Sequence, residues 1–65
     1  MISYKPLLHT LLDKGYKKTD LYKLIGASST TVAKIAKNEY ISLKTIDDIC
    51  TALNCKIEDI VEHLD

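Results

Sequence analysis

The chain has 65 residues, 46% of them hydrophobic, and a formal net charge of zero. A chain this short buries only about 60% of its unfolded surface, so we expect one small core and a single domain over residues 1–65. No apolar run reaches the ~20 residues that a membrane-spanning helix needs. The first residues, MISYKP, lack the apolar segment of a signal peptide, so we expect a cytoplasmic protein without a membrane partner.

The charges are divided unevenly along the chain. Residues 1–46 contain eight lysines against three acidic residues, a net charge of +5, whereas residues 47–65 contain one lysine against six acidic residues, a net charge of −5. Segregation of this kind can present a basic face to a polyanion while an acidic face keeps the protein soluble. The alternative is random placement of surface charge.

Apolar residues recur with helical rather than alternating spacing, which predicts an all-α fold of five helices. The first helix is expected from about Pro6, a residue suited to an initial helical position, to Lys14, where Gly15 ends it. The second is expected from about Lys18 to Ile25, before Gly26. The apolar residues that these two helices should bury are Leu7, Leu8, Leu11 and Leu12 in the first, and Leu21, Leu24 and Ile25 in the second.

Three further helices are predicted after Gly26. The third opens at Ser28 or Ser29, either of which can cap it, and ends before Asn38. The fourth follows Ser42 as its cap, and the fifth covers about residues 57–64, with acidic residues in its first turn where the helix dipole favours negative charge. The apolar residues expected in the core are Val32, Ile35 and Ala36 in the third helix, Ile46, Ile49, Cys50 and Leu53 in the fourth, and Ile57, Ile60, Val61 and Leu64 in the fifth.

Residues able to perform chemistry are few. Cys50 and Cys55 are spaced C-x4-C without a second Cys or His pair, so two buried thiols in a reducing compartment are expected, with no metal site and no cofactor. His9 and His63 lie near opposite ends of the chain and are interpreted as surface or half-buried helix residues and not as catalytic bases. Adjacent carboxylates at positions 47 and 48 would point about 100° apart on a helix and would not converge. The sequence therefore does not predict an enzyme.

The link between the second and third helices is only Gly26-Ala27-Ser28. Because the link is so short, the two helices must cross at a steep angle. Gly26 can adopt the positive φ that ends the first of them, and Ser28 can then cap the next helix. This arrangement is a helix-turn-helix, which can present its second helix to a DNA major groove. Short turns of this kind also occur in helical bundles that bind no DNA.

The stretch KTDLYKLIGASSTTVAKIAKNEYISLKTIDDICTALNCKIEDIV resembles the Cro/C1-type (XRE-like) helix-turn-helix family of lambda-repressor-like DNA-binding domains. The matching features are Leu21 five residues before Gly26, the Gly-x-Ser turn, Val32 and Ile35 on one side of the third helix, and the run ICTALNCKIEDIV. The resemblance implies a compact five-helix bundle in which the second and third helices form the helix-turn-helix.

Four positions depart from the family pattern. Tyr22 occupies the place of a small residue where the second helix packs on the third, so either the helices are spaced differently or the ring points to solvent. Lys18 replaces a common Gln, which retains phosphate binding but loses amide readout. The loop after the third helix lacks the usual Gly, and Lys56 replaces the Ser or Thr cap of the fifth helix.

The resemblance implies base contacts from one face of the third helix, namely from Ser29, Thr30, Ala33 and Lys34. At 100° per residue these side chains lie within an arc of about 140°, opposite the apolar face. Lys34 can donate to guanine O6 and N7, the hydroxyls can donate or accept, and the methyl groups of Thr30 and Ala33 can contact a thymine methyl. The alternative is an ordinary solvated helix face. The expected phosphate contacts are Lys17, Lys18, Ser28, Lys37, Asn38, Tyr40, Ser42 and Lys44.

These inferences predict a sequence-specific regulator of transcription that binds double-stranded DNA, either a repressor or a controller protein, and that is nucleoid-associated when bound. One copy contacts only a few base pairs, so a homodimer on a pseudo-palindromic operator is expected, with the acidic back half as the surface for self-association. No small-molecule ligand is expected. The alternative is a protein-interaction module on the same scaffold, antitoxin-like or an accessory subunit, with little DNA specificity of its own.

Overall fold

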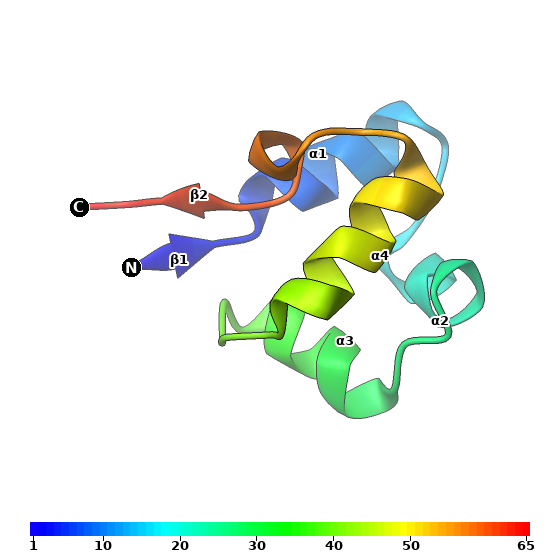
Figure 1. The fold of residues 1–65 in the computed structure, drawn as a ribbon, viewed down its shortest axis with the longest axis horizontal. Helices are drawn as coiled ribbons and strands as arrows, with labels where there is room; N and C mark the ends of the chain where they lie inside the picture. Colours follow the sequence, from blue (N-terminus) through cyan, green and yellow to red (C-terminus); the bar gives the residue numbers. More distant parts are fainter.

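The computed structural model describes residues 1–65 as four α-helices joined by short loops, with two 3₁₀ turns and one small sheet (Figure 1). The α-helices are α1 (Lys5–Asp13), α2 (Leu21–Leu24), α3 (Ser29–Ala36) and α4 (Leu43–Leu53). The 3₁₀ turns are η1 (Lys18–Asp20), directly before α2, and η2 (Ile57–Asp59), after α4. The strands are β1 (Ile2–Ser3) and β2 (Glu62–His63).

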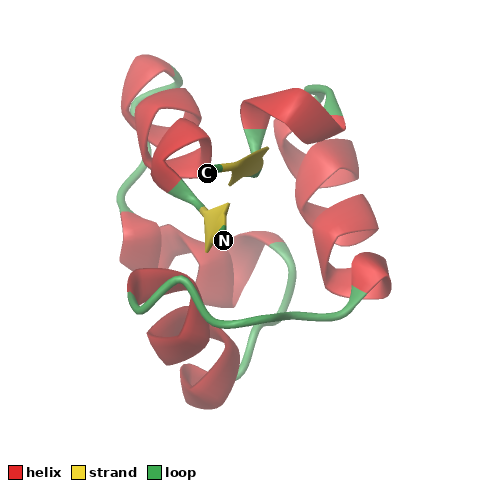
Figure 2. Cartoon of the chain, turned by 90° about the vertical axis from the view of Figure 1, so that its left-hand side faces the viewer, coloured by secondary structure: helices red, strands yellow, loops and turns green.

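The two strands bring the beginning and the end of the chain together. They pair antiparallel, with Ile2 opposite His63 and Ser3 opposite Glu62. Both chain ends therefore lie at the same end of the molecule, beside each other in both views (Figures 1 and 2). The sheet was not expected, because two-residue strands carry no periodic pattern in a sequence.

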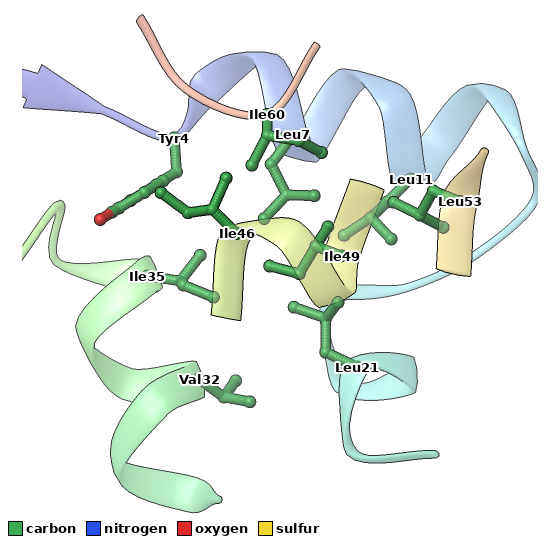
Figure 3. Close-up of a cluster of buried hydrophobic side chains, with 10 residues drawn as sticks. All are labelled: Tyr4, Leu7, Leu11, Leu21, Val32, Ile35, Ile46, Ile49, Leu53 and Ile60. Atoms are coloured by element: carbon green, nitrogen blue, oxygen red, sulfur yellow. The ribbon is translucent and has the colours of Figure 1, made fainter. Parts of the chain in front are cut away.

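The core is built around α4, which crosses the middle of the molecule (Figure 1). Its buried residues Ile46, Ile49 and Leu53 meet side chains from every other α-helix and from the segment after η2 (Figure 3). Removing an aliphatic side chain of this size from water is worth about 1.5–3 kcal/mol. The complete buried hydrophobic cluster is Tyr4, Leu7, Leu11, Leu21, Val32, Ile35, Ile46, Ile49, Leu53 and Ile60.

The prediction of a fifth helix over residues 57–64 was wrong. Only η2 forms there, and β2 follows it. The backbone groups that would continue a helix are used elsewhere, because the Leu7 N–H donates to the Ile60 carbonyl over 3.2 Å and the Thr10 hydroxyl donates to the Asp59 carbonyl over 2.7 Å. The β-branched side chains of Ile60 and Val61 also lower the helix propensity of this segment. Ile57 and Leu64, expected in the core, are exposed.

Other helices were placed correctly with differences at their margins. The segment expected as one second helix is divided into η1 and a short α2. Leu8 and Leu12, assigned to the buried stripe of α1, are exposed because only Leu7 and Leu11 face α4 and the rest of the core. Ala36, assigned to the core of α3, is exposed in its last turn.

Candidate nucleic-acid interface

The turn between α2 and α3 has the conformation that its residues predicted. Gly26 adopts a φ of 64°, which reverses the chain after α2. Ser28 is the N-cap of α3, and its Oγ accepts a hydrogen bond from the Thr31 N–H over 3.2 Å. A cap of this type satisfies a backbone donor that would otherwise lack a partner at the helix start. The Ser28 hydroxyl is thus already engaged within the protein, although its residue is exposed.

Helix α3 separates an anchoring face from an open face. Val32 and Ile35 are buried in the core (Figure 3), and Thr31 is half-buried. The four residues expected to touch base edges, Ser29, Thr30, Ala33 and Lys34, are all exposed. None of their side chains makes a hydrogen bond or an ion pair within the protein, so their polar groups are available to a ligand.

The residues expected to contact phosphate come from both sides of α3 in the sequence. Lys17 precedes η1, and its backbone N–H donates to the Asp20 Oδ2 over 2.8 Å. The Lys17 residue is exposed, and its ammonium group makes no ion pair within the protein. Lys18 is half-buried in η1, and Lys37 is exposed directly after α3. Tyr40 is 79% exposed in the loop that follows.

The start of α4 supplies the last two expected phosphate contacts. Ser42 is its N-cap, as predicted, and the Ser42 Oγ accepts from the Thr45 N–H over 3.1 Å. Lys44 forms an ion pair with Asp48 over 3.0 Å, one turn along the same helix. Because a solvent-exposed pair of this spacing contributes only about 0.3–0.5 kcal/mol, a phosphate can compete for the Lys44 ammonium.

Asn38 differs from the other residues expected to contact phosphate. Its backbone takes a left-handed conformation, with a φ of 57°. Its Oδ1 accepts a hydrogen bond from the Tyr4 N–H over 3.0 Å. The side-chain oxygen is therefore part of the fold, and only the amide nitrogen of Asn38 is left for a phosphate.

Tyr4 was not recognised from the sequence as part of this region. The side chain is 2% exposed, and its hydroxyl donates to the Glu39 carbonyl over 2.7 Å. Burial raises the pKa of the Tyr4 phenol, and a backbone hydrogen bond with Ile41 opposes part of that rise. The contact joins residues 35 positions apart in sequence, so no local pattern indicates it.

A groove of about 480 Å³ lies between the N-terminal segment and the end of α3. It gathers Lys34, Asn38 and Tyr40 from the expected interface, but also Glu39, whose carboxylate would repel a phosphate. The groove is completed by Met1 and Ile2. The sequence predicted the first three residues as DNA contacts but not their proximity to the N-terminal segment.

Two further departures from the family pattern, at Tyr22 and Lys56, are explained by the geometry. Tyr22 is 41% exposed, so its ring extends to solvent and does not separate α2 from α3. At Lys56, no side chain caps η2, but the Lys56 backbone N–H donates to the Asp59 Oδ2 over 3.1 Å, which satisfies one backbone donor at the start of this turn.

The cysteines and histidines lie apart from α3 in the chain. Cys50 and Cys55 are free and half-buried around the end of α4. Burial raises the pKa of the Cys55 thiol, and the neighbouring Cys50 and Asp59 raise it further. His9 and His63 are exposed, but His63 lies in β2 and not in the helix expected there. The structure contains no group of three or more His, Cys, Asp or Glu side chains that could hold a metal ion.

The sequence of the helix-turn-helix region and of the rest of the domain matches a known protein family. Residues 7–65 match the family model of the Cro/C1-type helix-turn-helix DNA-binding domain. The chain belongs to this family. The resemblance seen in the α2-turn-α3 segment is therefore confirmed, although the α-helices number four and not five.

A solved structure gives the second comparison. The crystal structure of the transcriptional regulator VanUg, Form II, is similar to this chain with a TM-score of 0.93 and 43% sequence identity. The match covers 97% of this chain and 84% of the VanUg chain. The search of curated proteins gave no match. None of the α-helices is long and apolar enough to cross a membrane.

Proposed function

We propose that this protein is a sequence-specific transcriptional regulator, a repressor or controller protein, that places α3 in the major groove of double-stranded DNA. The observation that carries the proposal is the exposed face of α3, whose Ser29, Thr30 and Lys34 side chains have no partner within the protein. Membership of the Cro/C1-type family and the 43% identity to a transcriptional regulator support it.

Base discrimination would come from a small set of groups. Lys34 donates to guanine O6 or N7, while the Ser29 and Thr30 hydroxyls donate to or accept from several bases. The Thr30 and Ala33 methyl groups contact a thymine methyl. Because no Arg, Gln or Asn lies on this face to form a two-bond contact with a base, DNA shape and bridging water contribute part of the specificity.

Affinity would come mainly from the surrounding cations. Four lysines flank α3 in the sequence, two before it (Lys17 and Lys18) and two after it (Lys37 and Lys44). Tyr40 adds an exposed hydroxyl. Ser28 and Ser42 are helix N-caps, so phosphate oxygens at these positions would accept from the free backbone N–H groups of the first turns. Asn38 contributes through its amide nitrogen.

We propose further that two copies bind a pseudo-palindromic operator, because one α3 helix reads too few base pairs for tight binding. Two recognition helices would then enter successive major grooves about 34 Å apart. The second copy would pack on the acidic second half of the chain, and this placement would keep it away from the DNA phosphates.

Selection from a pool of random duplexes tests the proposal. The protein is expected to enrich a pseudo-palindromic motif, whose half-sites lie about one helical turn apart. Retained, salt-sensitive binding without enrichment of any motif would contradict it. That result would favour the alternative, a protein-interaction module on the same scaffold.

A further inference from the structure

The segment before α1 is packed against the end of the recognition helix. Tyr4 lies between β1 and α1, and its ring belongs to the same buried cluster as Ile35 of α3 and Ile46 of α4 (Figure 3). The match to the family model begins at residue 7, so Tyr4 lies outside the matched region. A residue outside this region therefore contacts the element that would read DNA.

Two hydrogen bonds join Tyr4 to the residues that follow α3. The Tyr4 N–H donates to the Asn38 Oδ1 over 3.0 Å, and the Tyr4 hydroxyl donates to the Glu39 carbonyl over 2.7 Å. Since the ring is almost completely buried, water cannot easily replace the hydroxyl bond. We refer to these two bonds as the Tyr4 clamp.

The clamped residues are also the ones that end α3. The Glu39 N–H donates to the Lys34 carbonyl over 2.8 Å, and the Asn38 N–H donates to the Ile35 carbonyl over 3.3 Å. This pair of bonds around a left-handed residue satisfies the last carbonyls of a helix. The position of the Lys34 backbone is thus coupled to Tyr4 through Glu39.

We propose that Tyr4 and Asn38 are positioning residues for DNA recognition. The clamp sets the last turn of α3, which carries Lys34, and the loop that carries Tyr40, before DNA is bound. Ordering these groups in advance removes an entropic cost from binding. This inference rests on the proposed function, and it adds that the N-terminal segment contributes to sequence discrimination without touching a base.

Two substitutions open the clamp while the core is kept. Tyr4→Phe keeps the ring and removes the hydroxyl, and Asn38→Gly keeps the left-handed backbone and removes the Oδ1 acceptor. Tyr22→Phe is the control for the first, because Tyr22 is exposed and its hydroxyl has no partner within the protein. Asn54→Gly is the control for the second, because Asn54 ends α4 with a φ of 51° and its side chain makes no hydrogen bond.

The first measurement is the ratio of the affinity for the selected operator to that for a scrambled duplex of equal length, at a temperature where circular dichroism shows every variant folded. The clamp variants are expected to lower this affinity ratio by roughly fivefold, because the loss of one intramolecular hydrogen bond typically changes an equilibrium constant by about that factor. Tyr4→Phe should leave binding to the scrambled duplex within about twofold, because all lysines remain. Asn38→Gly also removes the amide nitrogen proposed for a phosphate, so it should weaken binding to both duplexes in addition to lowering the ratio. A purely structural role would lower the melting temperature and leave the ratio unchanged.

The second measurement is amide hydrogen exchange in the absence of DNA. Tyr4→Phe and Asn38→Gly are expected to accelerate exchange at the Glu39 amide relative to amides of α4, whereas the two control variants are not. If the selection yields no operator, the proposed function fails, and this exchange still decides whether the clamp orders the end of α3. Unchanged exchange at Glu39, or an unchanged affinity ratio despite an operator, would overturn the inference.

Discussion

At the scale of single residues, the exposed face of α3 carries small hydroxyls and one long cation. The sequence predicted the four exposed positions, because Val32 and Ile35 define the opposite, buried face by helical spacing. It did not predict that the Asn38 oxygen is occupied, since that hydrogen bond comes from Tyr4, 34 positions away. Residues with local roles were thus predictable, and those with distant partners were not.

Lys34 should be the main determinant of base preference. Lys34→Ala is expected to change the bases enriched at one position of each half-site, because a lysine donating to guanine O6 or N7 is worth about 1–3 kcal/mol of discrimination at most. Selection with the variant protein measures this change.

Lys18→Ala is the matched comparison for Lys34. It should weaken binding to all duplexes alike and reduce the slope of log affinity against log salt by about one. If neither substitution changes DNA binding, the assignment of α3 as the recognition helix is wrong.

Tyr4 should make the protein sensitive to alkali. Its pKa is raised by burial, so above about pH 10 the unfolded chain loses a phenolic proton that the folded chain retains. The stabilising effect of the neutral phenol is therefore complete below that pH and is lost as pH rises toward the folded pKa. Denaturant titrations from about pH 8 to above pH 10, where the unfolded phenol ionises, measure this loss.

The alkaline loss has an internal control in the same chain. Tyr4→Phe should remove part of the pH dependence of the free energy of unfolding, and Tyr22→Phe, the same substitution at an exposed tyrosine, is the matched control. Parallel pH profiles for the wild type and Tyr4→Phe would show that the phenol does not remain buried and neutral.

At the scale of elements, every α-helix is followed by a residue in the left-handed conformation. Asn54 lies directly after α4, whereas Gly15, Gly26 and Asn38 lie two positions beyond the last residue of α1, α2 and α3. Gly15 and Gly26 were predicted as stops because glycine adopts this conformation without strain. The two asparagines carry a weaker signal, since Asn also occurs within helices and turns. Helix starts were clearer, because Ser28 and Ser42 are both typical caps.

The turn glycine offers a test at this scale. A Cβ added at Gly26 meets no atom within 4 Å, so Gly26→Ala introduces only the backbone strain of a φ of 64°. We expect a loss of about 1 kcal/mol in the free energy of unfolding, measured by denaturant titration. Gly26→Asn should cost less, because asparagine tolerates this conformation. An equal loss for both variants would show that strain is not the cause.

At the scale of the whole molecule, the helical period of the apolar residues was enough to predict a small helical bundle, whereas the helix-turn-helix was predicted from the short link at Gly26 and the family resemblance. It was not enough for the region after α4, where Ile60 and Val61 have helical spacing but the backbone bonds to α1 and β1 instead. Tertiary contacts decide whether a segment forms a local helix or pairs with a distant part of the chain, and the spacing of apolar residues gives no information about such contacts.

Assembly is the prediction that belongs to this scale. Sedimentation of the protein with a selected operator should show two copies per duplex, and a single half-site should bind one copy with much lower affinity. Each phosphate neutralised by the pair should add about 0.9 to the salt slope. If sedimentation shows only a monomer at high concentration, with and without operator DNA, the proposed dimer is wrong.

The pairing of β1 with β2 has a consequence for the order of folding. Ile2 and Ser3 leave the ribosome before any of the helices, yet their partners His63 and Glu62 are made after all of them. Contacts between such distant residues form slowly, because a long loop must close first. The helices can therefore assemble around α4 while the N-terminal segment is still free. The strand beside Tyr4 can therefore complete its pairing only after α4 and η2 have been made.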